Sequence, residues 1–560
     1  MKLTSLTLLL LAMSFMVSAD TNTLNKEQIQ AVDEIFSDWD KVDTPGCALG
    51  IIKGGKLIYA RGYGMANLEY NLPNNSKSVY RIGSTSKQFT AASIIILEEK
   101  GELSLDDTLN KYFPDFPDYA KTITIRHLLN HTSGIRNYLT LYLLKGLQPI
   151  DYFTNKDVMR WLINQTELNF QPGEEYGYSN SGYWLLGQIV NQVAEMSMAD
   201  FAMQEIFKPL GMNSTHFHND YTHIVKNRAT GYVPNGHGGF QIQMSTIDMS
   251  GAGGIFTTVE DMKKWDDAYY DSKVFSKAFW KMMTQRGILN NGETLDYASG
   301  LEIRDYKGLK TISHDGGFAG YVAQLLRFPE QNISFVLLMN RADVSPTDMA
   351  FKVADVFLND QYVEEEKEPD NSDENSNDNV TDNDKQFSPE QVVGNYELRP
   401  GLEINITLVN NKLHALQKWD GKENNLNKGE FNSYTNDNAE KTKFTFTELK
   451  DNSAQKMIAV SHGRKWHWVR KEPVDLSSIK IQEYVGNYYS SGLDVVYKIT
   501  SGDEWLKLQI EYGDLNNLVL IKKDSFFYRD LILQFNRDNG VINGFTMDAW
   551  GDKNFKFVKQ

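Results

Sequence analysis

Ser84 and Lys87, three positions apart, are the residues of this chain best suited to covalent chemistry. They lie in "RIGSTSKQFTAASIIILEEKG", residues 81–101, where an apolar run has close to helical spacing. Residues three apart on a helix face the same way, so the Lys87 amine can reach the Ser84 hydroxyl. A serine beside a lysine held neutral can attack a carbonyl and form an acyl-enzyme. A serine near a helix start is usually a cap, so the pair alone leaves both interpretations open.

Two later segments favour catalysis. In "PGEEYGYSNSGYWLLGQIV", Tyr178 and Asn180 precede a predicted amphipathic helix. A tyrosine hydroxyl can relay a proton and an asparagine amide can hold a substrate carbonyl. In "LKTISHDGGFAGYVAQLLRF", the run His314–Gly317 enters a predicted strand, where glycine lets a substrate backbone approach the strand edge.

In order and spacing, these segments resemble the serine β-lactamase and penicillin-binding-protein superfamily, with its S-x-x-K, S-D-N and K-T-G elements. The second and third elements are similar to the Tyr-x-Asn and His-x-Gly variants of class C β-lactamases, D,D-peptidases, D-aminopeptidases and esterases. The stretches "ITIRHLLNHTSGI", "IFKPLGMNSTHF" and "GAGGIFTTVEDMKKW" strengthen the resemblance, which covers roughly residues 30 to 360. It implies an α+β fold, an antiparallel sheet flanked by helices, with the cleft between the sheet and an all-α part.

The resemblance also implies a role for each motif residue. Ser84 would be the nucleophile, Lys87 the base for acylation, and Tyr178 the proton shuttle. The substrate would be bound by Asn180, His314, Asp315 and Gly316, with His314 in a place where lysine is commoner. Backbone N–H groups of Ser84 and Gly317 would form the oxyanion hole. The resemblance implies neither a cofactor nor a metal.

Asp315 is the main departure from the family pattern. Successive strand side chains point to opposite faces, so if His314 points behind the cleft, Asp315 faces the substrate. Family enzymes that accept β-lactams or C-terminal D-Ala usually present a hydroxyl, backed by a cation, to the substrate carboxylate. Two like charges ~4 Å apart repel by about 1 kcal/mol in water and about 4 kcal/mol at a dielectric of 20. The sequence therefore predicts that anionic substrates are handled poorly and that amides, esters or amine-bearing substrates are preferred.

Composition excludes several classes of protein. The 560 residues are too many for one core, and a net charge of -16 without a basic stripe argues against nucleic acid. Residues 1–19, with Lys2 and an apolar run from Leu6 to Val17, predict a signal peptide and an exported, periplasmic or extracellular protein. No later apolar run reaches the ~20 residues of a membrane span. Cys47 is the single cysteine, which excludes an internal disulfide.

An acidic segment divides the chain. Residues 364–385, "EEEKEPDNSDENSNDNVTDNDK", hold ten acidic residues and two lysines, a net charge of -8 and half of the total. Such a segment buries too little apolar surface to order, which predicts a disordered linker. We therefore predict a hydrolase domain at 20–362, the linker at 363–387, and two further domains at 388–473 and 474–560.

The C-terminal region contains an internal repeat. Gly394 aligns with Gly486 and Tyr396 with Tyr488, and the closing strands "KWHWVRK" and "NFKFVKQ" also correspond. Short alternating segments separated by Asn, Gly and Asp predict two small antiparallel, lipocalin-like β-barrels. An S-x-x-K domain followed by two such barrels looks most like the D-aminopeptidase architecture.

Two other pairs of residues have simpler explanations than a binding site. His127 and His131 are four apart on a predicted helix, but the Glu of the zincin pattern is missing, so we expect them to pack and cap. Trp466 and Trp468 fit a barrel core, although an exposed one could bind glycan.

A histidine-rich stretch, "THFHNDYTH", places His216, His218 and His223 close together with Asp220 between them. Alternating histidines on a strand could bind zinc. A solvated loop is the simpler interpretation, and we expect no metal.

The sequence thus predicts an exported serine hydrolase that acts on peptide, amide or ester substrates related to D-amino acids or cell-wall fragments. An esterase of the same fold is the nearest alternative, and a true β-lactamase is more distant. A non-catalytic binding protein is the alternative from another class, against which the retention of all four S-x-x-K and Tyr-x-Asn residues argues.

Overall fold

The computed structural model describes residues 24–560 except 149, 364–385, 400–401, 419–420, 438–441, 462–463, 472–478, 503–505 and 512. The predicted signal peptide and the acidic segment 364–385 lie outside the described residues. The described chain forms two compact units. One comprises Met1–Leu103, Gly187–Gly287 and Leu295–Glu364, and the other comprises Ser104–Leu186, Ile288–Thr294 and Glu365–Gln560, each within its described part.

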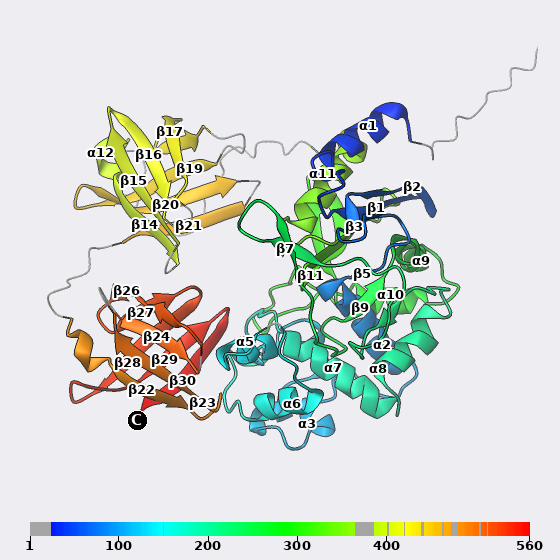
Figure 1. Ribbon diagram of the computed structural model, residues 1–560, viewed down its shortest axis with the longest axis horizontal. Helices are drawn as coiled ribbons and strands as arrows, with labels where there is room; N and C mark the ends of the chain where they lie inside the picture. Colours follow the sequence, from blue (N-terminus) through cyan, green and yellow to red (C-terminus); the bar gives the residue numbers. More distant parts are fainter. Residues whose placement is uncertain are drawn as a thin grey trace, which may run out of the picture. The chain divides into compact units, whose positions relative to one another are not determined.

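A six-stranded antiparallel sheet forms the centre of the first unit (Figure 1). Its order is β10-β11-β12-β13-β1-β2, with bounds Glu302–Tyr306, Leu309–Phe318, Tyr321–Phe328, Ile333–Met339, Cys47–Lys53 and Lys56–Tyr63. Strand β1 pairs with β13 from Cys47 opposite Met339 to Lys53 opposite Ile333. This pairing joins segments that lie far apart in the sequence, because β1 comes near the start of residues 32–356 and β13 near their end.

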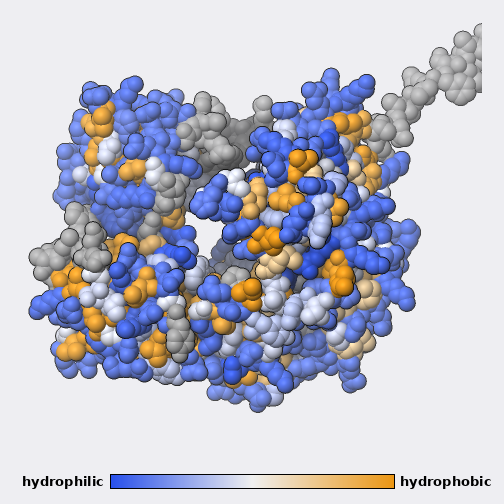
Figure 2. All heavy atoms as spheres, in the orientation of Figure 1, coloured by the Kyte–Doolittle hydropathy of each residue, from blue (hydrophilic) through white to orange (hydrophobic). Residues whose placement is uncertain are grey.

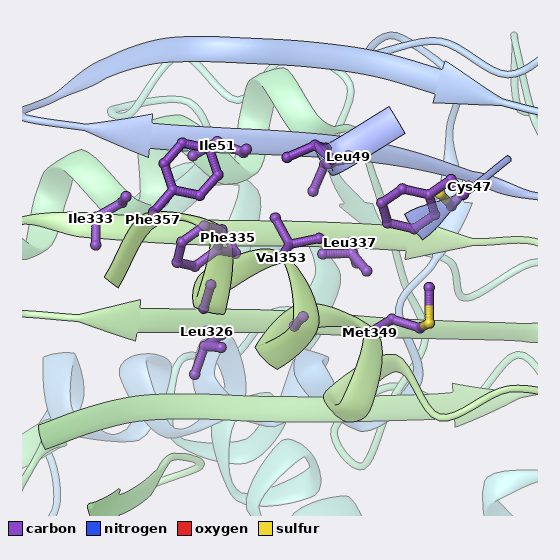
Figure 3. Close-up of a cluster of buried hydrophobic side chains, with 14 of the residues drawn as sticks. Cys47, Leu49, Ile51, Leu326, Ile333, Phe335, Leu337, Met349, Val353 and Phe357 are labelled. Carbon is purple, nitrogen blue, oxygen red and sulfur yellow. The ribbon is translucent and has the colours of Figure 1, made fainter. Parts of the chain in front are cut away.

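Two helices cover one face of this sheet, α1 (Lys26–Ile35) and α11 (Pro346–Leu358). Figure 3 shows Leu49, Ile51, Phe335 and Leu337 from the strands meeting Val353 of α11. All five side chains are fully buried. Burying each large aliphatic or aromatic side chain contributes about 1.5–3 kcal/mol to the stability of the fold. This layer of side chains therefore stabilises the sheet.

Two longer helices of this unit are α2 (Lys87–Glu99) and α9 (Val259–Tyr270). Helix α10 (Lys277–Met283) is shorter, and the short helix α8 (Met198–Ala202) runs into a π-helical turn at Met203–Phe207. The small strands are β3 (Met65–Asn67), β4 (Leu72–Pro73), β5 (Tyr80–Arg81), β6 (His216–Phe217), β7 (Tyr232–Pro234), β8 (Phe240–Ile242) and β9 (Ile255–Thr257). Helix α2 is buried along almost its whole length, as expected of a central helix.

Helices also begin the second unit. They are α3 (Leu109–Tyr112), α4 (Ile125–Leu129), α5 (Tyr138–Leu144) and α6 (Asn155–Ile163), and α7 (Asn180–Val193) starts here. Thr124 and Thr154 cap α4 and α6 through capping boxes. In α4 the side chain that completes the box is His127, whose Nδ1 accepts the Thr124 N–H at 3.1 Å, so the prediction that this histidine caps is confirmed.

The repeated C-terminal region folds as the sequence predicts. Short helix α12 (Pro389–Val392) precedes a closed eight-stranded antiparallel barrel, barrel 1. Its strands are β14 (Gly394–Arg399), β15 (Leu402–Val409), β16 (Lys412–Gln417), β17 (Glu423–Lys428), β18 (Ser433–Asn436), β19 (Lys443–Lys450), β20 (Ser453–Ser461) and β21 (Arg464–Arg470). Trp468 is buried in its core and Trp466 packs against that core, which confirms the prediction for this pair.

Barrel 2 is a nine-stranded antiparallel sheet in the order β25-β24-β23-β22-β30-β29-β28-β27-β26. Its strands are β22 (Gly486–Ser490), β23 (Val495–Ser501), β24 (Leu506–Ile510), β25 (Leu515–Asn517), β26 (Val519–Lys522), β27 (Ser525–Tyr528), β28 (Leu531–Asp538), β29 (Val541–Ala549) and β30 (Asp552–Lys559).

The sequence repeat corresponds to equivalent positions in the two barrels. Gly394 and Gly486 start the first strands, with φ of 154° and 155°. The hydroxyls of Tyr396 and Tyr488 each donate to the carbonyl four residues earlier, at 3.0 and 2.7 Å. The predicted fold class, an α+β domain followed by two antiparallel barrels, is confirmed.

Hydrophobic residues on the surface and the length of the helices bear on membrane association. On the face shown in Figure 2, hydrophobic residues lie in small groups among hydrophilic ones. None of the helices in the described ranges is both long and apolar enough to cross a membrane.

Candidate active site

Ser84 lies in a 3-10 turn, Gly83–Ser86, that leads directly into α2. The spacing argument treats Ser84 and Lys87 as residues of one helix, but α2 starts at Lys87 and Ser84 lies before it. The turn preserves the predicted contact, since Lys87 Nζ lies 3.1 Å from Ser84 Oγ. The amine also donates to the carbonyl of Ala252 at 2.7 Å, which fixes its direction.

The Lys87 side chain is completely buried, whereas Ser84 is half-buried. Burial lowers the pKa of the Lys87 amine to about 7, and the Asp315 carboxylate opposes that shift only in part. A charged ammonium loses its hydration when buried, so the neutral amine is favoured. A neutral amine within hydrogen-bonding distance of a serine hydroxyl can accept its proton, which is the condition for using Ser84 as a nucleophile.

Strand β11 runs against this turn and leaves one edge open. Among the described strands, β10 pairs with β11 only from Leu309 to Ser313, while β12 continues to pair as far as Phe318. The Thr85 hydroxyl donates to the carbonyl of His314 at 3.3 Å. The edge from His314 onward therefore passes directly beside Ser84.

Gly316 allows this close approach. A Cβ at this position would lie 2.0 Å from the carbonyl oxygen of Ile82 and 2.7 Å from the Ser84 nitrogen. No real side chain tolerates such distances, so glycine is required by contact and not by an unusual φ. At Gly317 a Cβ would meet nothing nearer than 3.5 Å, the distance to a methyl of Val322.

We expect Gly316→Ala to separate β11 from the Ser84 turn. Overpacking of this kind lowers the free energy of unfolding by about 1–3 kcal/mol. The temperature of thermal unfolding should decrease, and so should the rate at which a fluorophosphonate labels Ser84. Gly317→Ala is the matched control for stability, since its methyl has room. Equal unfolding temperatures for the two variants would contradict this account.

His314 and Asp315 alternate as a strand requires. The His314 side chain is 2% exposed and that of Asp315 is 55% exposed. His314 Nδ1 lies 2.5 Å from the carbonyl of Asp315, and Nε2 lies 2.9 Å from the hydroxyl of Tyr297. Burial and the nearby charge of Lys87 lower the pKa of the His314 imidazole. These contacts fit a neutral ring with the proton on Nδ1, so His314 adds no positive charge to this edge.

Tyr178 and Asn180 belong to the other unit, where Asn180 begins α7. The Tyr178 ring is 38% exposed and packs on the His131 ring with centroids 4.2 Å apart. The carbonyl of His131 accepts the N–H of Gly177 at 2.8 Å, and its Nδ1 accepts the N–H of Ser179 at 3.2 Å. His131 thus holds the backbone on both sides of Tyr178.

The sequence interpretation missed this role for His131. Its backbone adopts a left-handed conformation, with φ of 58°, which turns the chain toward the tyrosine segment. Because the two segments are more than 40 residues apart, no local pattern indicates the contact.

The histidine-rich stretch is more buried than predicted. His218 is buried, His216 is half-buried in β6, and only His223 is exposed, so a solvated loop is wrong for two of the three. Burial, with the charge of nearby groups such as His216, lowers the pKa of His218 to about 4. Within the ranges described above, no group of three or more His, Cys, Asp or Glu is arranged to hold a metal ion.

Comparison with known proteins gives this arrangement its family. Residues 32–356 match the Beta-lactamase family model. The chain is 31% identical to penicillin-binding protein 4* of Bacillus subtilis (strain 168) over 379 residues, 65% of this chain and 81% of that protein. It is 26% identical to a D-aminopeptidase of Brucella anthropi over 315 residues, 56% of this chain and 59% of that protein.

A solved structure supports the fold. The octameric penicillin-binding protein homologue from Pyrococcus abyssi superimposes with a TM-score of 0.54 at 24% identity, covering 79% of this chain and 99% of that one. The protein described here belongs to the beta-lactamase family. It is a serine hydrolase, as the sequence predicts.

Proposed function

We propose that the chain is an exported hydrolase that forms an acyl-enzyme on Ser84 and acts on amide, peptide or ester substrates related to D-amino acids. The contact that carries this proposal is the 3.1 Å approach of the buried Lys87 amine to Ser84 Oγ. Similarity to a D-aminopeptidase supports the substrate class.

The proposed reaction assigns roles to Ser84, Lys87 and Tyr178 and to two groups that hold the substrate. Ser84 Oγ bonds to the substrate carbonyl carbon while its proton passes to the neutral amine of Lys87. The oxyanion accepts hydrogen bonds from the backbone N–H groups of Ser84 and Gly317, a contribution of ~3 kcal/mol per donor in other hydrolases. Tyr178 relays the proton to the departing amine or alcohol, and water then hydrolyses the acyl ester. Asn180 binds the substrate amide.

Charge at the β11 edge supports a preference among substrates. Asp315 is exposed there, and the neighbouring His314 is neutral, so the edge carries a negative charge with no cation from His314 behind it. Substrate carboxylates would meet repulsion, whereas a free amine would be attracted. We therefore infer that D-aminoacyl amides and esters are better substrates than penicillins or free C-terminal peptides.

The test is turnover of a D-aminoacyl amide, acyl-D-Ala-D-Ala, a nitrophenyl ester and a cephalosporin, measured in parallel. We expect Asp315→Thr to raise kcat/KM for carboxylate-bearing substrates about fivefold to tenfold, since removing a repulsion of about 1 kcal/mol corresponds to that factor. The same variant should lower kcat/KM for amine-bearing substrates. The opposite ranking would mean that Asp315 does not face the substrate.

The panel also separates the alternatives. Turnover of esters alone would identify an esterase of the same fold. No turnover and no labelling of Ser84 would identify a non-catalytic binding protein. Export is tested by whether the mature protein, recovered outside the cytoplasm, begins at Asp20.

A further inference from the structure

Barrel 2 is attached to the helices of its own unit through Asp552, the first residue of β30. The Asp552 carboxylate is 4% exposed. It accepts the backbone N–H of Asn137, 3.1 Å from each carboxylate oxygen, and the side-chain amide of Asn169 at 2.6 Å. The side-chain Oδ1 of Asn169 in turn accepts the backbone N–H of Lys553 at 2.9 Å. One turn of the barrel therefore binds two separate segments of the helical region.

Arg136 reinforces this attachment from the helical side. Its guanidinium donates to the carbonyls of Lys553 and Asn554 at 2.8 and 3.2 Å and lies over the Phe555 ring at 4.5 Å. It also donates to Gln165 at 2.8 Å. Arg136 is 6% exposed, so these hydrogen bonds are made largely without competition from water.

The two segments that Asp552 binds also bind each other. The carbonyl of Gly134 accepts the N–H of Asn169, and that of Thr132 accepts the N–H of Gly173, both at 2.8 Å. The next contact in this series is His131, which holds the backbone on either side of Tyr178. A continuous series of hydrogen bonds therefore connects the two segments, from Asn137 and Asn169 beside the barrel to the residues on either side of Tyr178.

We propose that Asp552 is a positioning residue, through which barrel 2 holds residues 131–137 and 169–179 in register and so orients Tyr178. The inference rests on the proposed function, in which Tyr178 protonates the leaving group. Barrel 2 then sets how well the enzyme cleaves substrates that need this proton. Amides need it most, because an amine anion cannot leave, whereas a nitrophenolate leaves without help.

The test compares a D-aminoacyl amide with a D-aminoacyl nitrophenyl ester in the Asp552→Ala variant. We expect kcat for the amide to decrease about tenfold to a hundredfold, approaching the 10²–10⁴ typical of general acid catalysis, and that for the ester to change less than about threefold. A purely structural role would lower the folded fraction and reduce both rates equally. Asp538→Ala, at an exposed hairpin of the same barrel, is the matched control and should change neither rate.

The double variant Asp552→Ala/Tyr178→Phe tests the route of the effect. If Asp552 acts through Tyr178, the second substitution adds little to the loss caused by Tyr178→Phe alone. Additive losses, or an unchanged amide-to-ester ratio in Asp552→Ala, would overturn the inference. If Asp552→Ala does not fold, Asn169→Ala removes both side-chain bonds to the barrel and must show the same ratio.

Failure of this inference is distinguishable from failure of the proposed function. If Ser84→Ala is inactive and Tyr178→Phe shifts the amide-to-ester ratio while Asp552→Ala does not, only the positioning role is wrong. If Ser84→Ala retains turnover, the proposed function itself is wrong, and the inference falls with it.

Discussion

Replacing Ser84 by alanine should abolish turnover of every substrate. The Oγ atom that forms the acyl bond is removed, and loss of a nucleophile in a serine protease lowers kcat by roughly 10⁶-fold. A fluorophosphonate probe should label the intact protein at Ser84 and leave the variant unlabelled, as intact-mass measurement and peptide mapping would show.

Ser93→Ala is the matched control for this substitution. Ser93 is buried on α2, the helix that follows Ser84, and its hydroxyl donates to the carbonyl of Phe89 at 2.9 Å. The control should keep full labelling. Labelling that persists in Ser84→Ala would place the nucleophile elsewhere and refute the assignment.

Activity should rise with pH through about 7, because Lys87 must lose a proton before it can accept one from Ser84. Burial lowers the pKa of this amine to about 7, so the reactive neutral form is scarce at pH 5 and dominant at pH 9. Below about pH 7, kcat/KM for an uncharged ester should fall about tenfold for each pH unit. A flat profile between pH 5 and 9 would exclude Lys87 as the base.

Lys87→Arg tests the same requirement without removing the positive charge. A guanidinium cannot be deprotonated in a protein, so we expect a loss of roughly a thousandfold or more in kcat/KM at every pH. Lys100→Arg, at the exposed end of the same helix and paired with Glu205 at 2.9 Å, is the control and should be unaffected. If Lys87→Arg stayed active and its kcat/KM still fell below about pH 7, the pH dependence would belong to another group.

Local patterns in the sequence predicted much of the fold because they depend on short-range periodicity. Alternation in strand β11 predicted opposite faces for His314 and Asp315, and their side-chain exposures of 2% and 55% agree. The spacing of Ser84 and Lys87 predicted their contact, although the connecting turn is 3-10 and not α-helical. The barrel repeat was predicted because Gly394 aligns with Gly486 and Tyr396 with Tyr488, and in the structure both glycines adopt the same backbone conformation.

Contacts between distant segments were not predictable in this way. His131 packs on Tyr178, and Asp552 binds Asn137 and Asn169 across more than 380 residues, yet none of these residues stands out among its sequence neighbours. Burial of His218 was missed for the same reason, since a polar stretch becomes buried only when other parts of the fold cover it.

The sequence by itself determined the family, the two barrels and the pairing of Ser84 with Lys87, because each depends on residues close together or on motifs in a set order. Only the tertiary structure decided the chemical state of that pair. The enclosure that lowers the pKa of Lys87 to about 7, the approach of Gly316 to Ser84 and the support of Tyr178 by His131 all come from segments brought together by folding. Desolvation and close packing are properties of the folded environment, and no residue carries them alone.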